Sequence, residues 1–225
     1  MTEARMQEAP QYKPGNFCWI ELGTTDAGAA KTFYKELFGW GYFDAPMGPD
    51  MVYTLINING KEIGGLYKLT SEMLEHRIPP HWLSYVAVDN ADNATAQATA
   101  AGATVMKGPF DVPEAGRMSV IQDPTGAVFA VWQDKGNPGS GVYRDVGSFC
   151  WNELGTNDTQ KAADFYSTLF GWAREAFPGP MEYTIFKNGG EGIAGMYEIT
   201  PEMGPVPPHW LVYFAVNDCD ATVQK

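Results

Sequence analysis

The chain has 225 residues, of which 44% are hydrophobic and 13% aromatic, and its formal net charge at pH 7 is −12. This apolar content predicts folded domains and excludes an intrinsically disordered chain. The acidity argues against nucleic acid and against an anionic membrane surface as partners.

The N-terminal segment and the cysteines indicate the cellular setting. No apolar stretch is long enough to cross a membrane, and the polar residues 1–14 lack the apolar centre of a signal peptide. We expect residues 1–14 to form a flexible tail. Cys18 and Cys150 fall within predicted strands, so we expect buried reduced thiols in a cytoplasmic protein rather than a disulfide.

An internal repeat sets the organisation of the chain. The segment Phe17–Thr24 (FCWIELGT) returns as Phe149–Thr156 (FCWNELGT). Over residues 17–40, 15 of 24 positions are identical in the second copy. The repeat predicts two related domains and identifies the positions that both copies keep.

The first copy predicts the element order βαβββ. Residues 17–23 read as a strand, Asp26 as the N-cap of a helix and Gly39 as its C-cap. Between the caps, apolar residues recur at helical spacing. Three strands follow near 40–44, 52–59 and 62–69, and the Asn59-Gly60 turn between the last two is typical of a hairpin.

The next stretch repeats this order with a weaker sequence match. We expect a strand at 81–88, a helix at 89–101 opened by Asp89, and strands at 104–107, 117–122 and 127–133. Modules 15–69 and 80–134 then make a first domain over 15–134, joined by the Gly/Pro/Ser linker 135–146 to a second domain over 147–225. The second domain is expected to be C-terminally incomplete, because its last module opens at 209–216 and the sequence ends at Lys225.

Several motifs resemble the vicinal oxygen chelate superfamily, which includes glyoxalase I, extradiol dioxygenases, fosfomycin resistance enzymes and bleomycin-binding proteins. They are FYxxLFGW after the Asp-capped helix, DPxGAxFAVW in the second module, and the GGLY, AGMY and PPHW segments, which are similar to a tandem-domain bacterial branch often labelled as hydroxylases. The resemblance implies an α+β fold in which paired βαβββ modules form cup-shaped mixed sheets.

The same resemblance implies a divalent metal in each cup, held by His, Gln or Glu from the first and last strands of each module. The resemblance places the first-strand ligand seven residues before the Asp that opens the helix. This position carries Trp19, Trp82 and Trp151, and alignment of the last module with the second gives Trp210. The last-strand position carries Ala130. Neither Trp nor Ala offers a lone pair to such a cation. We therefore predict no metal and no other cofactor, with a divalent metal as the alternative.

Strand alternation predicts what the cups offer instead. It places Trp19 and Glu21 on one face, and the resemblance makes this the cup face. The expected ligand-binding residues are aromatic or small, and an aromatic pocket suits a flat or lipophilic organic molecule, although the indoles could equally fill the cup as core. The expected ligand-binding residues are Trp19, Tyr53, Trp82 and Ser84 in the first domain and Trp151, Tyr183 and Trp210 in the second.

Glu21 and Glu153 are the candidate catalytic residues, because a carboxyl group in an apolar cup has a raised pKa and can act as a general acid or base. The alternative is a rim glutamate bonded to backbone donors or an arginine. His81 and His209 are expected to face away from the cup. A register slip of one residue would instead make them metal ligands, for example His81 with Glu21.

These observations predict a glyoxalase-like protein that binds a small organic molecule without the usual metal. The alternatives are a lyase, dioxygenase or hydroxylase of the same superfamily that uses Glu21, Glu153 or a displaced metal, and a scaffold with filled cups. The sequence leaves open whether the protein self-associates.

Overall fold

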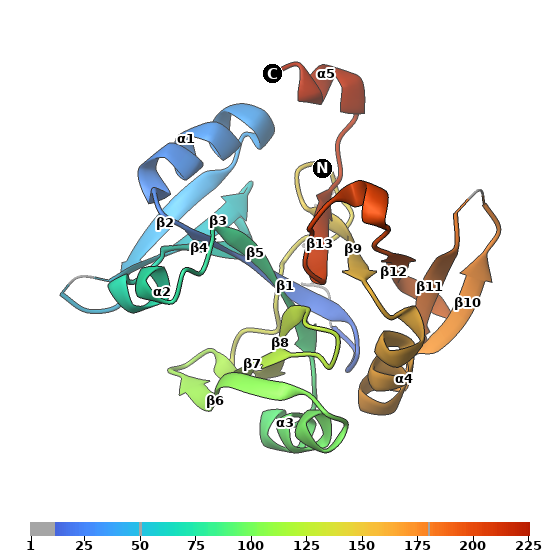
Figure 1. The fold of residues 1–225 in the computed structure, drawn as a ribbon. Helices are drawn as coiled ribbons and strands as arrows, with labels where there is room; N and C mark the ends of the chain where they lie inside the picture. Colours follow the sequence, from blue (N-terminus) through green and yellow to red (C-terminus); the bar gives the residue numbers. More distant parts are fainter. Residues whose placement is uncertain (1–11, 50, 180) are drawn as a thin grey trace, which may run out of the picture.

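The structure is a computed structural model that describes residues 12–49, 51–179 and 181–225. Most of the expected tail lies outside the described residues. Figure 1 shows the chain in three groups of elements, with blue strands and α1 in one, green strands and α3 in the second, and yellow-to-red strands with α4 in the third. None of the helices in the described ranges is long and apolar enough to cross a membrane.

The first repeat supplies two βαβββ modules, as the sequence predicts. The first contains β1 (Phe17–Thr24), α1 (Ala27–Phe38), β2 (Gly41–Pro46), β3 (Val52–Ile58) and β4 (Lys61–Lys68), followed by the short helix α2 (Ser71–Glu75). The second contains β5 (His81–Ala87), α3 (Ala91–Ala100), β6 (Thr104–Val112), β7 (Gly116–Gln122) and β8 (Val128–Asp134).

The second repeat follows the same order. It contains β9 (Phe149–Thr156), α4 (Thr159–Phe170), β10 (Ala173–Phe177), β11 (Tyr183–Asn188) and β12 (Glu191–Glu198), then the 3-10 turn η1 (Pro201–Met203), β13 (His209–Phe214) and α5 (Cys219–Val223). Local signals set the helix ends: Asp26 and Asp158 accept hydrogen bonds from the first turns of α1 and α4, and Gly39 and Gly171 end these helices in the left-handed conformation.

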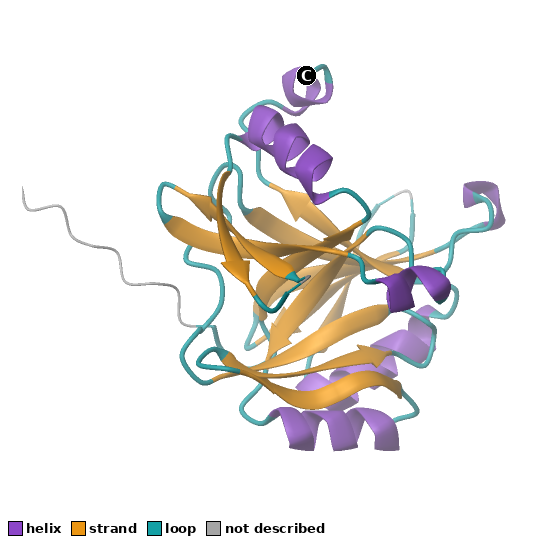
Figure 2. Ribbon diagram, turned by 90° about the vertical axis from the view of Figure 1, so that its left-hand side faces the viewer, coloured by secondary structure: helices purple, strands orange, loops and turns teal. Residues whose placement is uncertain are grey.

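The strands form two mixed sheets, which confirms the expected α+β fold of paired βαβββ modules. The first sheet has the order β2-β3-β4-β1-β5-β8-β7-β6, and the second, smaller sheet has the order β10-β11-β12-β9-β13. In the first sheet the two modules meet where β1 pairs antiparallel with β5, and each of these strands pairs parallel with the last strand of its own module. Figure 2 shows the pronounced twist of the strands.

The two sheets are held together by a shared apolar core. Ile20 and Val86 from the first sheet belong to the same buried cluster as Leu154 and Trp210 from the second. Helices α3 and α4 contact each other beside this core, at the bottom of Figure 1. We call the sheet faces that carry these residues the core faces.

Two tryptophans bind reciprocally across the repeat. Trp40 follows α1 and donates from Nε1 to the carbonyl oxygen of Gly147, at 2.8 Å. Its repeat-equivalent Trp172 follows α4 and donates to the carbonyl oxygen of Gly15, also at 2.8 Å. Both indoles are almost completely buried, so each repeat fixes the chain just before the first strand of the other.

One polar pair lies inside the contact between the sheets. Ser84 Oγ donates to Asn152 Oδ1 at 2.7 Å, and both residues are fully buried. Asn152 Nδ2 has no hydrogen-bond partner within the described residues. The pair therefore carries the cost of a buried amide that is only half satisfied.

We predict that Ser84→Ala destabilises the protein by about 1–3 kcal/mol, because the Asn152 amide then loses its remaining side-chain partner. Adding Asn152→Leu should recover most of this loss, because no buried polar atom of the pair is then left without a partner and leucine is close to asparagine in size. Urea unfolding of the wild type, both single variants and the double variant measures the coupling. A double variant that is no more stable than Ser84→Ala would contradict this account.

Candidate functional site

We call the opposite face of each sheet, which carries Trp19 and Glu21 or Trp151 and Glu153, the cup face. The register of the first sheet brings distant residues into neighbouring rows on this face. Trp19 lies opposite Tyr85, and Glu21 lies between Gly65 on β4 and Leu83 on β5. The cup face is thus built from both modules.

A chain of hydrogen bonds connects an indole, a phenol and a carboxylate on the first cup face. Trp19 Nε1 donates to Tyr53 Oη at 3.2 Å, and Tyr53 Oη donates to Glu21 Oε2 at 2.7 Å. Trp19 is buried, whereas Tyr53 and Glu21 are half-buried and remain accessible to a ligand. The structure therefore brings together three residues that the sequence assigned to the site.

Two glycines make room for this arrangement. A Cβ on Gly65 would lie only 1.9 Å from Tyr53 Oη, so the tyrosine occupies the space of the missing side chain. A Cβ on Gly23 would lie 2.9 Å from Tyr67 Oη and 3.1 Å from the His81 ring. Tyr67 and His81 therefore flank the strand next to Glu21.

The second sheet repeats the cluster residue by residue. Trp151 Nε1 donates to Tyr183 Oη at 3.2 Å, and Tyr183 Oη donates to Glu153 Oε1 at 2.6 Å. Tyr213 Oη donates to the other carboxylate oxygen, also at 2.6 Å. A Cβ on Gly195 would lie 1.7 Å from Tyr183 Oη, as at Gly65.

Burial controls the protonation of the first cluster. It raises the pKa of the Glu21 carboxyl, while the hydrogen bond from Tyr53 acts in the opposite direction. It also raises the pKa of the Tyr53, Tyr67 and Tyr85 hydroxyls above the ordinary value of 10. The phenols therefore stay protonated at physiological pH and serve as hydrogen-bond donors rather than as bases.

The tyrosines at 67, 85, 197 and 213 were missed by sequence reasoning, although the repeat contained a signal. Each tyrosine of the first cluster has an identical partner at the equivalent position of the second, Tyr67 with Tyr197 and Tyr85 with Tyr213. A comparison of all positions shared by the two copies, not only those in the first strand, would have selected them.

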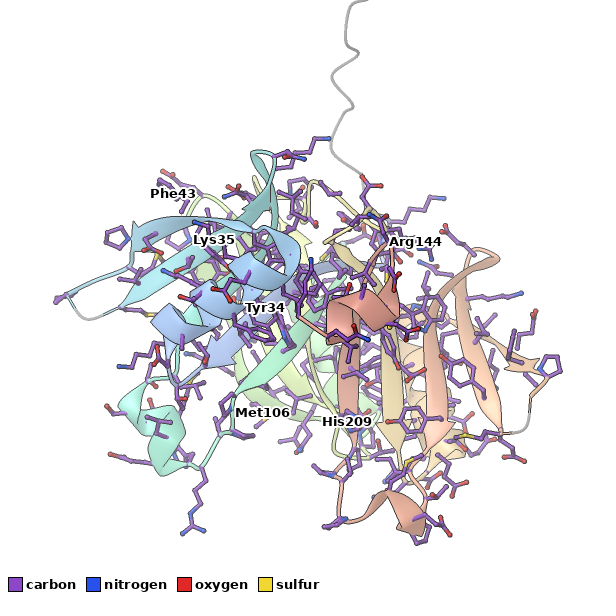
Figure 3. All side chains as sticks on the ribbon, turned by 90° about the horizontal axis from the view of Figure 1, so that it is seen from above. Tyr34, Lys35, Phe43, Met106, Arg144 and His209 are labelled. Atoms are coloured by element: carbon purple, nitrogen blue, oxygen red, sulfur yellow. The ribbon has the colours of Figure 1, made fainter. Side chains whose placement is uncertain are left out.

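Three expected cup residues lie on the core face instead. Trp82 donates from Nε1 to Tyr34 Oη of α1, which Figure 3 labels, and Ser84 binds Asn152. Trp210 is buried and donates to Tyr166 Oη. The expectation that Trp82, Ser84 and Trp210 lie on the cup face was therefore wrong.

The physical reason is an offset of one residue at the helix cap. Asn90, not Asp89, accepts the hydrogen bond that opens α3. Side chains alternate along a strand, so a count that starts from Asp89 instead of Asn90 assigns the side chains of β5 to the wrong face. Leu83, rather than Trp82, then stands where the resemblance places a first-strand ligand, and a similar count from the Asp218 cap of the last module gives Leu211.

The same offset corrects the expectation for the two histidines. His81 pairs with Gly23 and His209 with Gly155, so both lie on the cup faces without any register slip. Figure 3 labels His209 at the start of β13. His81 Nδ1 lies 2.8 Å from the Pro79 carbonyl oxygen and His209 Nδ1 2.9 Å from that of Pro207. Donation to these carbonyls leaves Nε2 of the neutral ring as an acceptor.

Comparison with known proteins decides the family. The family described as the glyoxalase/bleomycin resistance protein/dioxygenase superfamily matches residues 17–131 and 149–225. The chain belongs to this superfamily.

Its relatives in this superfamily include named bacterial proteins. CFP32 of Mycobacterium tuberculosis, a protein named as a glyoxylase, is 38% identical over 223 residues, which cover 98% of this chain and 84% of that protein. The anthracycline biosynthesis protein DnrV of Streptomyces peucetius is 36% identical over 227 residues, which cover 96% of this chain and 82% of that protein.

Solved structures of the superfamily share the fold at low sequence identity. The Mn(II)-bound glyoxalase from Novosphingobium aromaticivorans aligns with a TM-score of 0.64 and 18% identity, over 92% of this chain and 67% of that one. An extradiol ring-cleaving dioxygenase from B. fuscum aligns with a TM-score of 0.58 and 14% identity, over 84% of this chain and 55% of that one.

The cup residues of this superfamily member do not fit the divalent metal that such folds imply. Trp19 and Leu83 occupy the first-strand ligand positions, and Ala130 and Gly65 occupy the last-strand positions. None of these side chains can coordinate a cation. Within the described residues, no three His, Cys, Asp or Glu side chains gather in a group that could hold one.

We predict that Gly195→Ala destabilises the second cup by about 1–3 kcal/mol, because the added methyl group displaces Tyr183 from Glu153. The matched control is Gly192→Ala on the same strand, where the new Cβ would approach Ile185 no closer than 3.3 Å. Urea unfolding should separate the two variants. Equal stability of both would show that the glycine is not needed to seat the tyrosine.

The raised pKa of Glu21 predicts a pH-dependent difference between the wild type and Glu21→Gln. The folded protein binds the Glu21 proton more tightly than the unfolded chain, so this contribution to stability is present below the ordinary value of 4.5 and is lost as the pH rises through the raised pKa. The variant should therefore gain stability relative to the wild type over that rise. Urea unfolding across pH measures this, with Glu36→Gln on α1 as the control. A pH-independent difference would refute the assignment.

Proposed function

We propose that the cup face of the first sheet binds a small organic molecule with an aromatic or lipophilic body. The observation that carries the proposal is the half-buried Tyr53–Glu21 pair set among aromatic rings, which joins apolar contact area to a hydrogen-bonding anchor. A site of this composition provides both affinity and orientation.

Exposed apolar residues extend this surface towards the edge of the sheet. Phe43 on β2 pairs with Leu55 on β3, and Leu55 packs against the aromatic cluster of the cup face. The Phe43 side chain is 63% exposed, although it is large and apolar, and Figure 3 labels it on the outer strand. A ligand lying over Phe43 and Leu55 would cover this surface.

The relatives support an aromatic ligand. DnrV is named as an anthracycline biosynthesis protein, and anthracyclines contain a planar fused-ring system. A planar anthraquinone is therefore the first probe to test with this chain.

We expect saturable quenching of tryptophan fluorescence by 1,4-dihydroxyanthraquinone. Trp19→Phe should weaken the Kd roughly threefold to tenfold, because the Tyr53 hydroxyl at the ligand then loses the hydrogen bond that positions it. Trp82→Phe is the matched control, because Trp82 also donates to a tyrosine hydroxyl but lies on the core face. Absence of saturation, or equal weakening in both variants, would overturn the proposal.

A further inference from the structure

The two cup carboxylates have no positively charged partner among the residues that the structure describes. Seven ion pairs occur within the described residues, and neither Glu21 nor Glu153 belongs to any of them. The groups that donate to the two carboxylates are tyrosine hydroxyls, Tyr53 to Glu21 and both Tyr183 and Tyr213 to Glu153. Each carboxylate thus keeps an unbalanced negative charge on the cup face when it is ionised.

The residues around Glu21 also suit a positive charge. Trp19, Tyr53, Tyr67 and Tyr85 supply aromatic rings next to the carboxylate, and such rings attract cations through their electron-rich faces. His81 adds an acceptor nitrogen when its ring is neutral. An anionic ligand would be repelled by the ionised Glu21 carboxylate, which no cation of the described residues neutralises.

We propose that the ligand of the cup face is an organic cation, an aromatic or lipophilic amine whose ammonium group lies at Glu21 against the tyrosine rings. This inference rests on the proposed function and specifies the charge of the ligand. The bound ammonium supplies the missing countercharge and donates hydrogen bonds to the carboxylate. The body of the ligand then lies over the apolar residues towards β2 and β3.

The second cup face supports this assignment independently. The second cluster keeps the same Trp, Glu, His and three Tyr at equivalent positions, with Glu153 again outside every ion pair of the described residues. The neighbouring strands β3 and β4 differ from β11 and β12 at most of their positions. The carboxylate and its rings are therefore among the features that both copies retain.

Three probes of similar size test the charge preference by calorimetric titration of the 225-residue chain. They are phenethylamine as the cation, 2-phenylethanol as the neutral analogue and phenylacetate as the anion. We expect phenethylamine to bind at least about tenfold more tightly than 2-phenylethanol, with phenylacetate the weakest, as an ion pair combined with a cation–π contact predicts.

The variant Glu21→Gln/Glu153→Gln should abolish this preference while the neutral probe binds as before. The control Glu36→Gln/Glu75→Gln removes the same net charge at exposed positions and should retain the preference. Loss of the preference in the control would assign it to the net charge of −12 and overturn the proposal.

The wild-type comparison is decisive even if the cup variant fails to fold. Binding of 2-phenylethanol as tight as that of phenethylamine overturns the cationic ligand but leaves the aromatic site of the proposed function intact. If neither these probes nor the anthraquinone binds, both proposals fail.

Discussion

The burial of one apolar core between the two sheets determines which side chains remain for chemistry. Each central strand can turn only one of its faces inward, so Ile20, Leu154 and Trp210 are committed to packing. Their neighbours in the strand, Glu21 and Glu153, must then face outward. The polar aromatic clusters on the two cup faces are thus a direct consequence of how the sheets associate.

Within each cup, glycine and tyrosine together replace the usual coordinating side chain. Gly65 leaves a space on β4, and the Tyr53 hydroxyl fills it from the adjacent strand β3. The result is a carboxylate held by neutral donors instead of a cation held by several ligands. The fold of the superfamily is kept, and the groups present at its centre are a carboxylate, tyrosine hydroxyls and aromatic rings.

Much of the fold could be predicted because its signals are local. The Asp26 and Asp158 caps, the Gly39 and Gly171 stops and the repeat itself fix the modules without reference to distant residues. The faces of β5 and β13 could not be fixed in this way. They depend on whether the helix cap is the first or the second residue of Asp89-Asn90 or Asn217-Asp218, and both residue types are good caps.

An irregularity in the strand pairing explains a second error of the prediction, the face assigned to Phe17. Simple alternation groups Phe17 with Trp19, yet the register shifts between these residues and sends Phe17 into the core between the sheets. The contribution of Tyr67 and Tyr85 depends on pairing between strands far apart in the sequence, which single-strand patterns do not contain.

The reciprocal bonds of Trp40 and Trp172 have a consequence for how the molecule comes apart. Because each indole is anchored in the opposite repeat, separating the halves would expose both rings to water at once. The halves should therefore melt in a single cooperative transition, accompanied by a red shift of the emission. A protease cut between Lys135 and Val146 would leave the two pieces associated, because the backbone connection is not what joins them.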